Sequence, residues 1–259
     1  MRIGLWWVDT CTLRILVAGA VALAWLGWWS RRHAGHRLST ESLGWGIAGV
    51  TAVALFAGRA GFILLNLDYF RQHPGAVLRL KQVAGIDDIG AMIGALAALG
   101  VWAARQGPGL TFYSLLSQLA PAGLWTAAGM WWARQGIGEA WGRVASSEGS
   151  WTWLATQSPD LYHTVALRYA VQTLGMGWAA LMALLAWLWG PNGVLAIALY
   201  LAGAAALTLL RGDQVPLLWG IRVDTVLYAG LALALTAYSG VALSRRTGIH
   251  TGLAGPEPR

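Results

Sequence analysis

Residues 169–210, YAVQTLGMGWAALMALLAWLWGPNGVLAIALYLAGAAALTLL, decide the fold, because this stretch contains no charged residue. It holds two runs of about 20 mostly apolar residues, the length that crosses a hydrocarbon core about 30 Å thick. The runs are separated only by Gly190-Pro191-Asn192-Gly193. Such a break is typical of a tight turn, so we predict two antiparallel neighbouring helices surrounded by lipid.

The rest of the chain has the same apolar character. Hydrophobic residues make up 57% of its 259 residues and charged residues 11%, with a mean hydropathy of +0.54. Soluble domains contain about 25% charged residues, so too few charges remain here to cover a water-facing surface. We predict an all-α integral membrane protein, a polytopic bundle of about seven transmembrane helices. The predicted spans are 12–29, 43–65, 88–104, 111–132, 169–189, 193–210 and 225–243.

We expect residues 1–259 to form a single transmembrane domain. The first apolar run ends in Trp28-Trp29 and Arg31-Arg32, not in a small-residue cleavage site, so it is predicted to be a retained helix. The polar interval at about 134–168 is too long to be a mere connector. We therefore expect it to be functional or ordered against the helices, at the outer face of the membrane.

Orientation follows from the arginines in short loops. One side carries arginines with few acids, at Arg31, Arg32, Arg37, Arg105, Arg245 and Arg246. The positive-inside tendency makes that side cytoplasmic, with the amino terminus outside and the carboxyl terminus inside. The opposite side carries charges of both signs. The formal net charge of +7 is spread over helix ends and not over one face, so it favours anionic lipid over nucleic acid as a partner.

Arg59 is the most informative charged residue, because it lies inside the apolar run 50–65. A charge there is costly and usually faces the bundle interior or a wet cavity, although a position near the helix end also allows the side chain to reach the interface. Two glycine pairs, at 58 and 61 and at 90 and 94, are spaced for close helix packing. We interpret them as packing sites in preference to places of ligand approach.

Two clusters near the outer face combine arginine, glycine and acids. Residues 134–143 (RQGIGEAWGR) follow a span that ends in Trp131-Trp132, and their charges suit either a headgroup pocket or an ordinary solvated loop. Residues 211–216 (RGDQVP), with Arg222 and Asp224, have the same ambiguity. No Cys, His or carboxylate pattern has metal-ligand spacing, so neither a metal nor another cofactor is expected.

Taken in order, these clusters resemble the prolipoprotein diacylglyceryl transferase family. Residues 57–62 (AGRAGF) are similar to its Gly-Gly-Arg-x-Gly-Tyr segment, and 138–143 (GEAWGR) to its Gly-Glu-x-Trp-Gly-Arg signature end. The resemblance covers most of the chain. Further matching positions are Asn66, Tyr69-Phe70, His73-Pro74, Ala120-Pro121, Leu161-Tyr162 and 210–213 (LRGD).

The resemblance implies an enzyme of the bacterial plasma membrane that moves a diacylglyceryl group from phosphatidylglycerol to the lipobox cysteine of prolipoproteins. The residues that carry it give the candidate phospholipid-binding set Arg59, Arg134, Glu139, Gly142, Arg143 and Arg211. The reaction needs a base or field that forms a thiolate and cations that stabilise the leaving phosphate. The only candidates for the base are His163, Asp87 and Asp88.

The chain departs from the family at several polar positions. Ile89 stands where the family has a histidine, Trp131 where it has its signature arginine, and Arg134 where it has an asparagine. The family's polar residues of the sixth and first helices are replaced as well, at Ala204, at Thr208 and near Arg14. These departures make catalysis doubtful.

Three kinds of function therefore stay open. The first is a divergent transferase whose partners are phosphatidylglycerol and prolipoprotein signal peptides. The second is a non-catalytic homologue that binds phospholipid or serves as a subunit beside other membrane proteins. A transporter or channel fits less well, because the charges gather at one face and not near the midplane.

Overall fold

The computed structural model of the chain is mostly helical. It describes residues 2–3, 6–7, 10–32, 40–78, 85–107, 110–146, 151–160, 162 and 164–251. The chain divides into two compact units, residues 29–115 and residues 1–28 with 116–259. We call them the inner unit (29–115) and the split unit (1–28 and 116–259), and each is described by itself.

A helix of 16 residues or more overlaps each of the seven segments predicted to span the membrane. The α-helices are α1 (Thr10–Arg32), α2 (Thr40–Leu65), α3 (Leu67–Gln72), α4 (Asp88–Arg105), α5 (Phe112–Ile137), α6 (Val171–Trp189), α7 (Gly193–Thr208) and α8 (Val223–Thr251). Short 3₁₀ turns are η1 (Pro74–Leu78), η2 (Thr152–Leu154) and η3 (Gly190–Asn192). Within the described residues the strands form three antiparallel pairs, β1 (Arg2–Ile3) with β2 (Trp6–Trp7), β3 (Ala155–Pro159) with β4 (Val165–Tyr169), and β5 (Leu217–Leu218) with β6 (Ile221–Arg222).

Four helices among the described residues are long and apolar enough to cross a membrane. These candidate spans are Glu41–Leu65, Asp88–Arg105, Val171–Trp189 and Val223–Ser244. The apolar parts of α1 and α7, Leu16–Gly27 and Gly193–Thr208, are shorter. An all-α membrane protein is consistent with these helices, whereas the crossing of all seven stays a prediction.

In the inner unit, α2 and α4 pack closely because glycines remove side chains from their contact. A Cβ atom on Gly94 would overlap the Cβ of Ala57, and one on Gly90 would come within 2.7 Å of the carbonyl oxygen of Ala57. Gly58 is enclosed in the same way by Ile86 and the Asp87 carbonyl. The interpretation of these glycines as helix-packing sites is confirmed.

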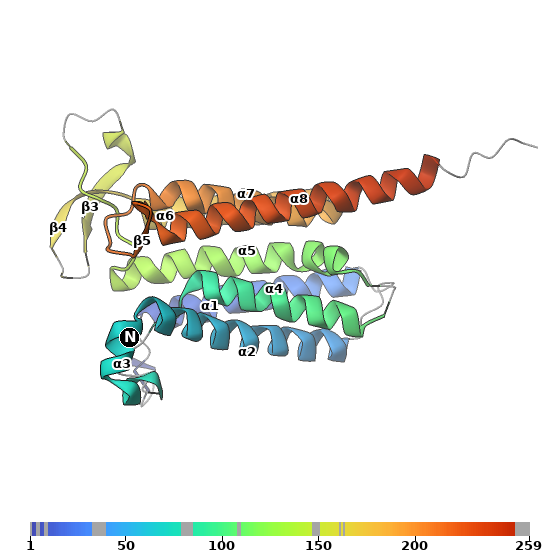
Figure 1. Ribbon diagram of the computed structural model, residues 1–259, viewed down its shortest axis with the longest axis horizontal. Helices are drawn as coiled ribbons and strands as arrows, with labels where there is room; N and C mark the ends of the chain where they lie inside the picture. The colour runs from blue at the N-terminus through green and yellow to red at the C-terminus, as the bar shows by residue number, and fades with distance from the viewer. Residues whose placement is uncertain are drawn as a thin grey trace, which may run out of the picture. The chain divides into compact units, whose positions relative to one another are not determined.

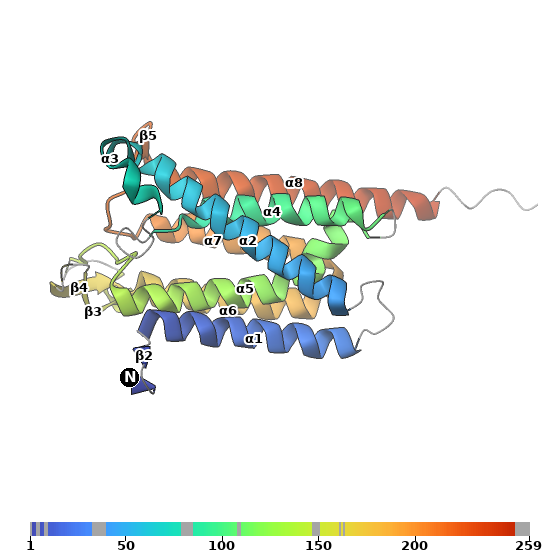
Figure 2. The ribbon, with the colours of Figure 1, turned by 90° about the horizontal axis from the view of Figure 1, so that it is seen from below.

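In the split unit, α5 lies against α1 and α6, and the three helices run alongside one another in Figure 2. Gly129 of α5 faces Ala18 of α1, while Gly175 of α6 leaves room for the ring of Trp131. The antiparallel pairing of α6 with α7 is confirmed by contacts of Trp178, whose indole N–H donates to the carbonyls of Leu199 and Tyr200.

Polar segments gather at one end of the split unit. Figure 1 shows the β3–β4 hairpin and β5 beside the same ends of α6, α7 and α8. In the hairpin, Thr156 pairs with Arg168 and Ser158 with Ala166. The described part of the interval 134–168 thus contains a β-hairpin next to the ends of three helices. Its exposure to the outside of a cell stays a prediction.

Candidate functional site

The segment that follows α5 is shaped by residues with positive φ. Gly138 (φ 69°) lies just after the helix, and the N–H of Glu139 returns to the carbonyl of Arg134 at 3.1 Å. This is the usual way in which a glycine ends a helix. Ala140 (φ 53°) turns the chain again, so that Trp141 enters a short extended stretch.

Residues 142–145 run between β4 and the segment after α7. On one side, the Arg143 N–H donates to the Leu210 carbonyl at 2.9 Å. On the other side, the Tyr169 N–H donates to the Arg143 carbonyl at 3.2 Å. Gly142 is buried, and a Cβ atom there would clash with the Tyr169 carbonyl oxygen. Gly142, Arg143 and the neighbourhood of Arg211 are thus brought together by the backbone.

The side chain of Arg143 takes no part in these backbone bonds. Its side chain is exposed, its guanidinium carbon lies 5.5 Å from the centre of the Tyr169 ring, and among the described residues it has no ion pair or side-chain hydrogen bond. The carboxylate of Glu139 is equally exposed and makes no such contact with any residue that the structure describes. One cation and one anion of the same segment therefore face outward.

Arg134 is half-buried, and its guanidinium carbon lies 5.3 Å from the centre of the Trp131 ring, one helical turn back. Trp131 is buried and donates its indole N–H to the Tyr200 hydroxyl at 3.3 Å. Trp131 thus belongs to the core, and its ring makes a cation–π contact with the Arg134 guanidinium.

Arg14 of α1 is a cation whose role the sequence did not reveal. It donates to the Trp132 carbonyl at 2.7 Å, and its guanidinium carbon lies 5.2 Å from the Trp132 ring centre. This bond ties α1 to α5 about one turn before the end of α5. A charge within an otherwise apolar helix, the signal that singled out Arg59, also applies to Arg14.

Arg211 is held by protein carboxylates. It bonds to Asp213 and, at 3.1 Å, to Asp224, and Arg222 bonds to the same two acids at 3.3 and 3.1 Å. Burial alone lowers the pKa of Arg222, but its hydrogen bonds and attraction to Asp224 and Asp213 outweigh this effect and raise the pKa. We call these four residues the clamp. The guanidinium of Arg211 thus already has two acidic partners. Its contact with lipid phosphate stays a prediction.

A second ion pair holds the β3–β4 hairpin. Arg168 is buried and donates to Asp160 at 2.9 Å and to the Gly142 carbonyl at 3.4 Å. Asp160 also accepts from the backbone N–H groups of Tyr162 and Thr164, both at 2.9 Å. The pair fixes the hairpin to residue 142. The separation of eight residues gives no local sequence signal for this contact.

Arg59 lies in the inner unit and is held by backbone carbonyls. It donates to Gly85, Ala76 and Val77 at 3.1–3.2 Å. Its guanidinium carbon also lies 5.6 Å and 5.4 Å from the ring centres of Phe62 and Phe70. Glu139, another residue of the candidate phospholipid-binding set, belongs to the other unit, so a single headgroup site that contains both Arg59 and Glu139 stays a prediction.

Of the three candidate bases, Asp87 and Asp88 lie in the described part of the chain. Asp87 caps α4, since its carboxylate accepts from the Gly90 N–H at 2.6 Å and its own N–H donates to the Gly58 carbonyl. Asp88 is the first residue of that helix. His163 lies outside the described residues. The geometry of Asp87 is that of a structural cap.

The positions that depart from the family pattern lie in packed surroundings. Ile89 and Ala204 are buried, and so is Thr208, whose hydroxyl bonds to the Ala205 carbonyl and the Thr225 hydroxyl. In the part of the chain that the structure covers, no group of three or more His, Cys, Asp or Glu residues could hold a metal ion.

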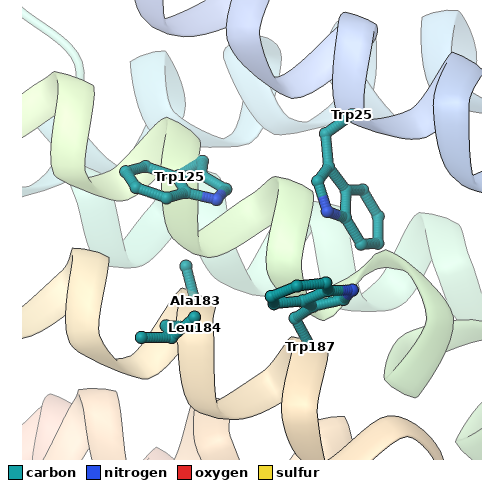
Figure 3. A pocket seen from close by; sticks show the side chains of 5 residues that line it. All are labelled: Trp25, Trp125, Ala183, Leu184 and Trp187. Atoms are coloured by element: carbon teal, nitrogen blue, oxygen red, sulfur yellow. The ribbon is translucent and has the colours of Figure 1, made fainter.

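The split unit also contains an apolar cavity of about 410 Å³. Figure 3 shows the rings of Trp25, Trp125 and Trp187 around it, with Ala183 and Leu184 on the α6 side. Trp187 lies near the end of α6 that is remote from β4, so this cavity is separate from residues 138–143. Its lining suits hydrocarbon.

Comparison of the chain with models of known protein families finds no match, and comparison with curated proteins finds none either. The resemblance to the diacylglyceryl transferases therefore stays a prediction from the motifs.

Proposed function

We propose that this protein is a multi-pass membrane protein that binds the phosphate of an anionic phospholipid headgroup at residues 138–143. Arg143 carries the proposal. Its exposed guanidinium has no ionic partner among the described residues, and its backbone is held on both sides by hydrogen bonds. Such a planar fork donates two parallel hydrogen bonds to phosphate. The backbone that carries the binding group is thus held in place before the ligand arrives.

The surroundings of Arg143 favour phosphatidylglycerol. The guanidinium carbon lies 5.5 Å from the centre of the Tyr169 ring, within the range of a cation–π attraction. The exposed carboxylate of Glu139 accepts hydrogen bonds only, which suits the two hydroxyl groups of a glycerol headgroup and opposes a second phosphate. Arg134 adds positive charge in the last turn of α5, just before this segment. The acyl chains of a lipid bound there would lie along the apolar helices.

We further propose that the chain is a divergent relative of the diacylglyceryl transferases with little or no transfer activity. Transfer depends on polar groups aimed at the thiolate and at the leaving phosphate, and losing one such donor costs about 2.7–4 kcal/mol, or roughly 10²–10³ in rate. Here the Trp131 N–H and the Thr208 hydroxyl already have protein partners, and Ile89 is apolar. These losses belong to one working unit and do not simply add, so the expected result is severe impairment.

An active transferase is the second candidate, and one observation favours it. The guanidinium of Arg134 lies over the ring of Trp131, the position that matches the family's signature arginine. A cation is thus present one turn from the expected place. A complementation experiment separates the two candidates.

The headgroup proposal is tested by titrating the detergent-purified protein with phosphatidylglycerol or phosphatidylcholine and counting bound lipids by native mass spectrometry. A hydrogen bond to a charged group contributes about 1.5 kcal/mol or more, so Arg143→Ala is expected to weaken phosphatidylglycerol binding about tenfold or more. Arg143→Lys should retain part of the affinity, because it keeps the charge without the fork.

The matched control is Arg105→Ala, which removes an exposed arginine from the last turn of α4. It is expected to leave the affinity unchanged. Equal affinity for phosphatidylglycerol in the unchanged protein, in Arg143→Ala and in Arg105→Ala would refute the proposed site.

A further inference from the structure

The β5–β6 hairpin between α7 and α8 presents an apolar tip to its surroundings. Residues 217–221 read Leu-Leu-Trp-Gly-Ile, and their exposed fractions reach 65% at Leu217, 88% at Trp219 and 50% at Ile221. A run of consecutive exposed apolar residues is unfavourable in water. The tip thus has the composition of a surface that meets a partner.

The backbone of the turn is unusual for a tryptophan. Trp219 (φ 52°) and Gly220 (φ 78°) are both left-handed, as a two-residue hairpin loop of the primed type requires. Asparagine and glycine adopt this conformation readily, whereas a bulky side chain does so at a cost. Because Trp219 is 88% exposed, its packing against the described residues offsets little of that cost.

The clamp holds the base of the hairpin. Arg222 of β6 bonds to Asp213 and Asp224, and the Val223 N–H donates to the Pro216 carbonyl at 3.0 Å. The four clamp residues contribute two positive and two negative charges, each matched by opposite neighbours. The clamp therefore adds no net charge at the foot of the β5–β6 hairpin, and its bonds hold the tip in one orientation.

The place of the hairpin along the chain indicates what the tip meets. The candidate span Val223–Ser244 begins directly after Arg222, so the hairpin lies at the level where that helix would leave the hydrocarbon. Figure 1 shows β5 at this end of α8. Tryptophan prefers the boundary between headgroups and acyl chains, where its ring is in apolar surroundings and its N–H is wet.

We propose that residues 217–221 insert into the headgroup boundary of the bilayer and anchor this end of α7 and α8 at a fixed depth. The occupant of the apolar surface is phospholipid and not a second protein. The strained Trp219 supplies the interfacial ring, Leu217 and Ile221 supply the apolar flanks, and the clamp sets the orientation. This anchor is independent of the headgroup site at Arg143.

A fluorescent probe at the tip tests the proposal in liposomes. In a Cys11→Ala background, Trp219→Cys and, separately, Leu217→Cys are labelled with an environment-sensitive dye. Burial roughly 5–10 Å into the boundary predicts quenching by lipids spin-labelled near the top of the acyl chain, and weaker quenching by lipids labelled near its end. Aqueous iodide should quench both probes several-fold less than a control probe at Gln157→Cys, an exposed position of β3.

Two results would overturn the anchor. Equal iodide quenching at Trp219, Leu217 and Gln157 would mean that the tip is in water. Protection from iodide without quenching by spin-labelled lipid would mean that protein covers the tip. Leu217→Cys keeps the measurement decisive, since it leaves the Trp219 turn unchanged.

Discussion

At the scale of single residues, Gly142 is tightly enclosed within the proposed headgroup site, residues 138–143. A methyl group there would meet the carbonyl oxygen of Tyr169, which is backbone and has little freedom to move. Gly142→Ala is therefore expected to lower the free energy of unfolding by about 1–3 kcal/mol, the usual cost of overpacking. Thermal unfolding in detergent measures the change.

The control for this prediction is Gly177→Ala in α6, where nothing lies within 4 Å of the added atom. Alanine favours a helix over glycine, so this variant should be neutral or slightly more stable. Equal melting temperatures for the two variants would show that Gly142 is not confined.

Arg59 and Arg143 show which properties of a single residue could be predicted from the sequence. Both were predicted from their residue type and motif. The structure bonds Arg59 to three carbonyls and leaves Arg143 exposed. A sequence reveals that a charge in an apolar run is constrained, but its partner depends on chain segments far along the sequence. For the same reason Asp87 was predicted to be a possible base, although an acid directly before an apolar helix is also a typical cap.

At the scale of elements, the contact between α2 and α4 depends on Gly94. Gly94→Leu is expected to destabilise the protein by about 1–3 kcal/mol, because its side chain would enter the space of Ala57 and the backbone of Val53. Unfolding in increasing concentrations of a denaturing detergent measures this loss. Gly100→Leu, in the same helix with nothing within 4 Å, should behave like the unchanged protein.

The clamp joins the β5–β6 hairpin to α8, and its carboxylates are 13–14% exposed. Asp224→Asn keeps the size of the side chain but removes the charge that Arg211 and Arg222 share. The expected loss is about 1.5–3 kcal/mol, the contribution of a charge-assisted hydrogen bond. The thermal midpoint should fall accordingly.

Asp68→Asn provides the comparison for the clamp. Asp68 is 96% exposed and lies 3.9 Å from Arg71, so its ion pair should contribute nothing measurable to stability. If both variants melt at the same temperature, the clamp does not stabilise the hairpin.

Helix positions could be predicted from apolar run length, since each predicted span falls on a long helix. The strands could not. β3 reads Ala-Thr-Gln-Ser-Pro and has no strong strand pattern, so it forms through its pairing with β4 and the Arg168–Asp160 bridge. The extended stretch at residues 142–145 likewise depends on Leu210 and Tyr169, which lie far along the chain.

At the scale of the whole molecule, the arginine distribution predicts an outside β3–β4 hairpin and a cytoplasmic carboxyl end. In a Cys11→Ala background, Thr164→Cys should react with a membrane-impermeant maleimide in intact cells. Thr251→Cys should react only after lysis. The reverse pattern would invert the orientation, and labelling of both in intact cells would contradict an odd number of crossings.

The central claim is that the chain keeps a headgroup site without the transfer reaction. Complementation of a bacterium depleted of its own transferase tests it most directly, with the chain confirmed in the membrane and prolipoprotein modification followed by mass shift. We predict no rescue. We also predict that phosphatidylglycerol still binds the same purified protein, and that Arg143→Ala weakens this binding. Full rescue that disappears with Arg59→Ala or Arg143→Ala, both still present in the membrane, would contradict the claim and establish an active transferase.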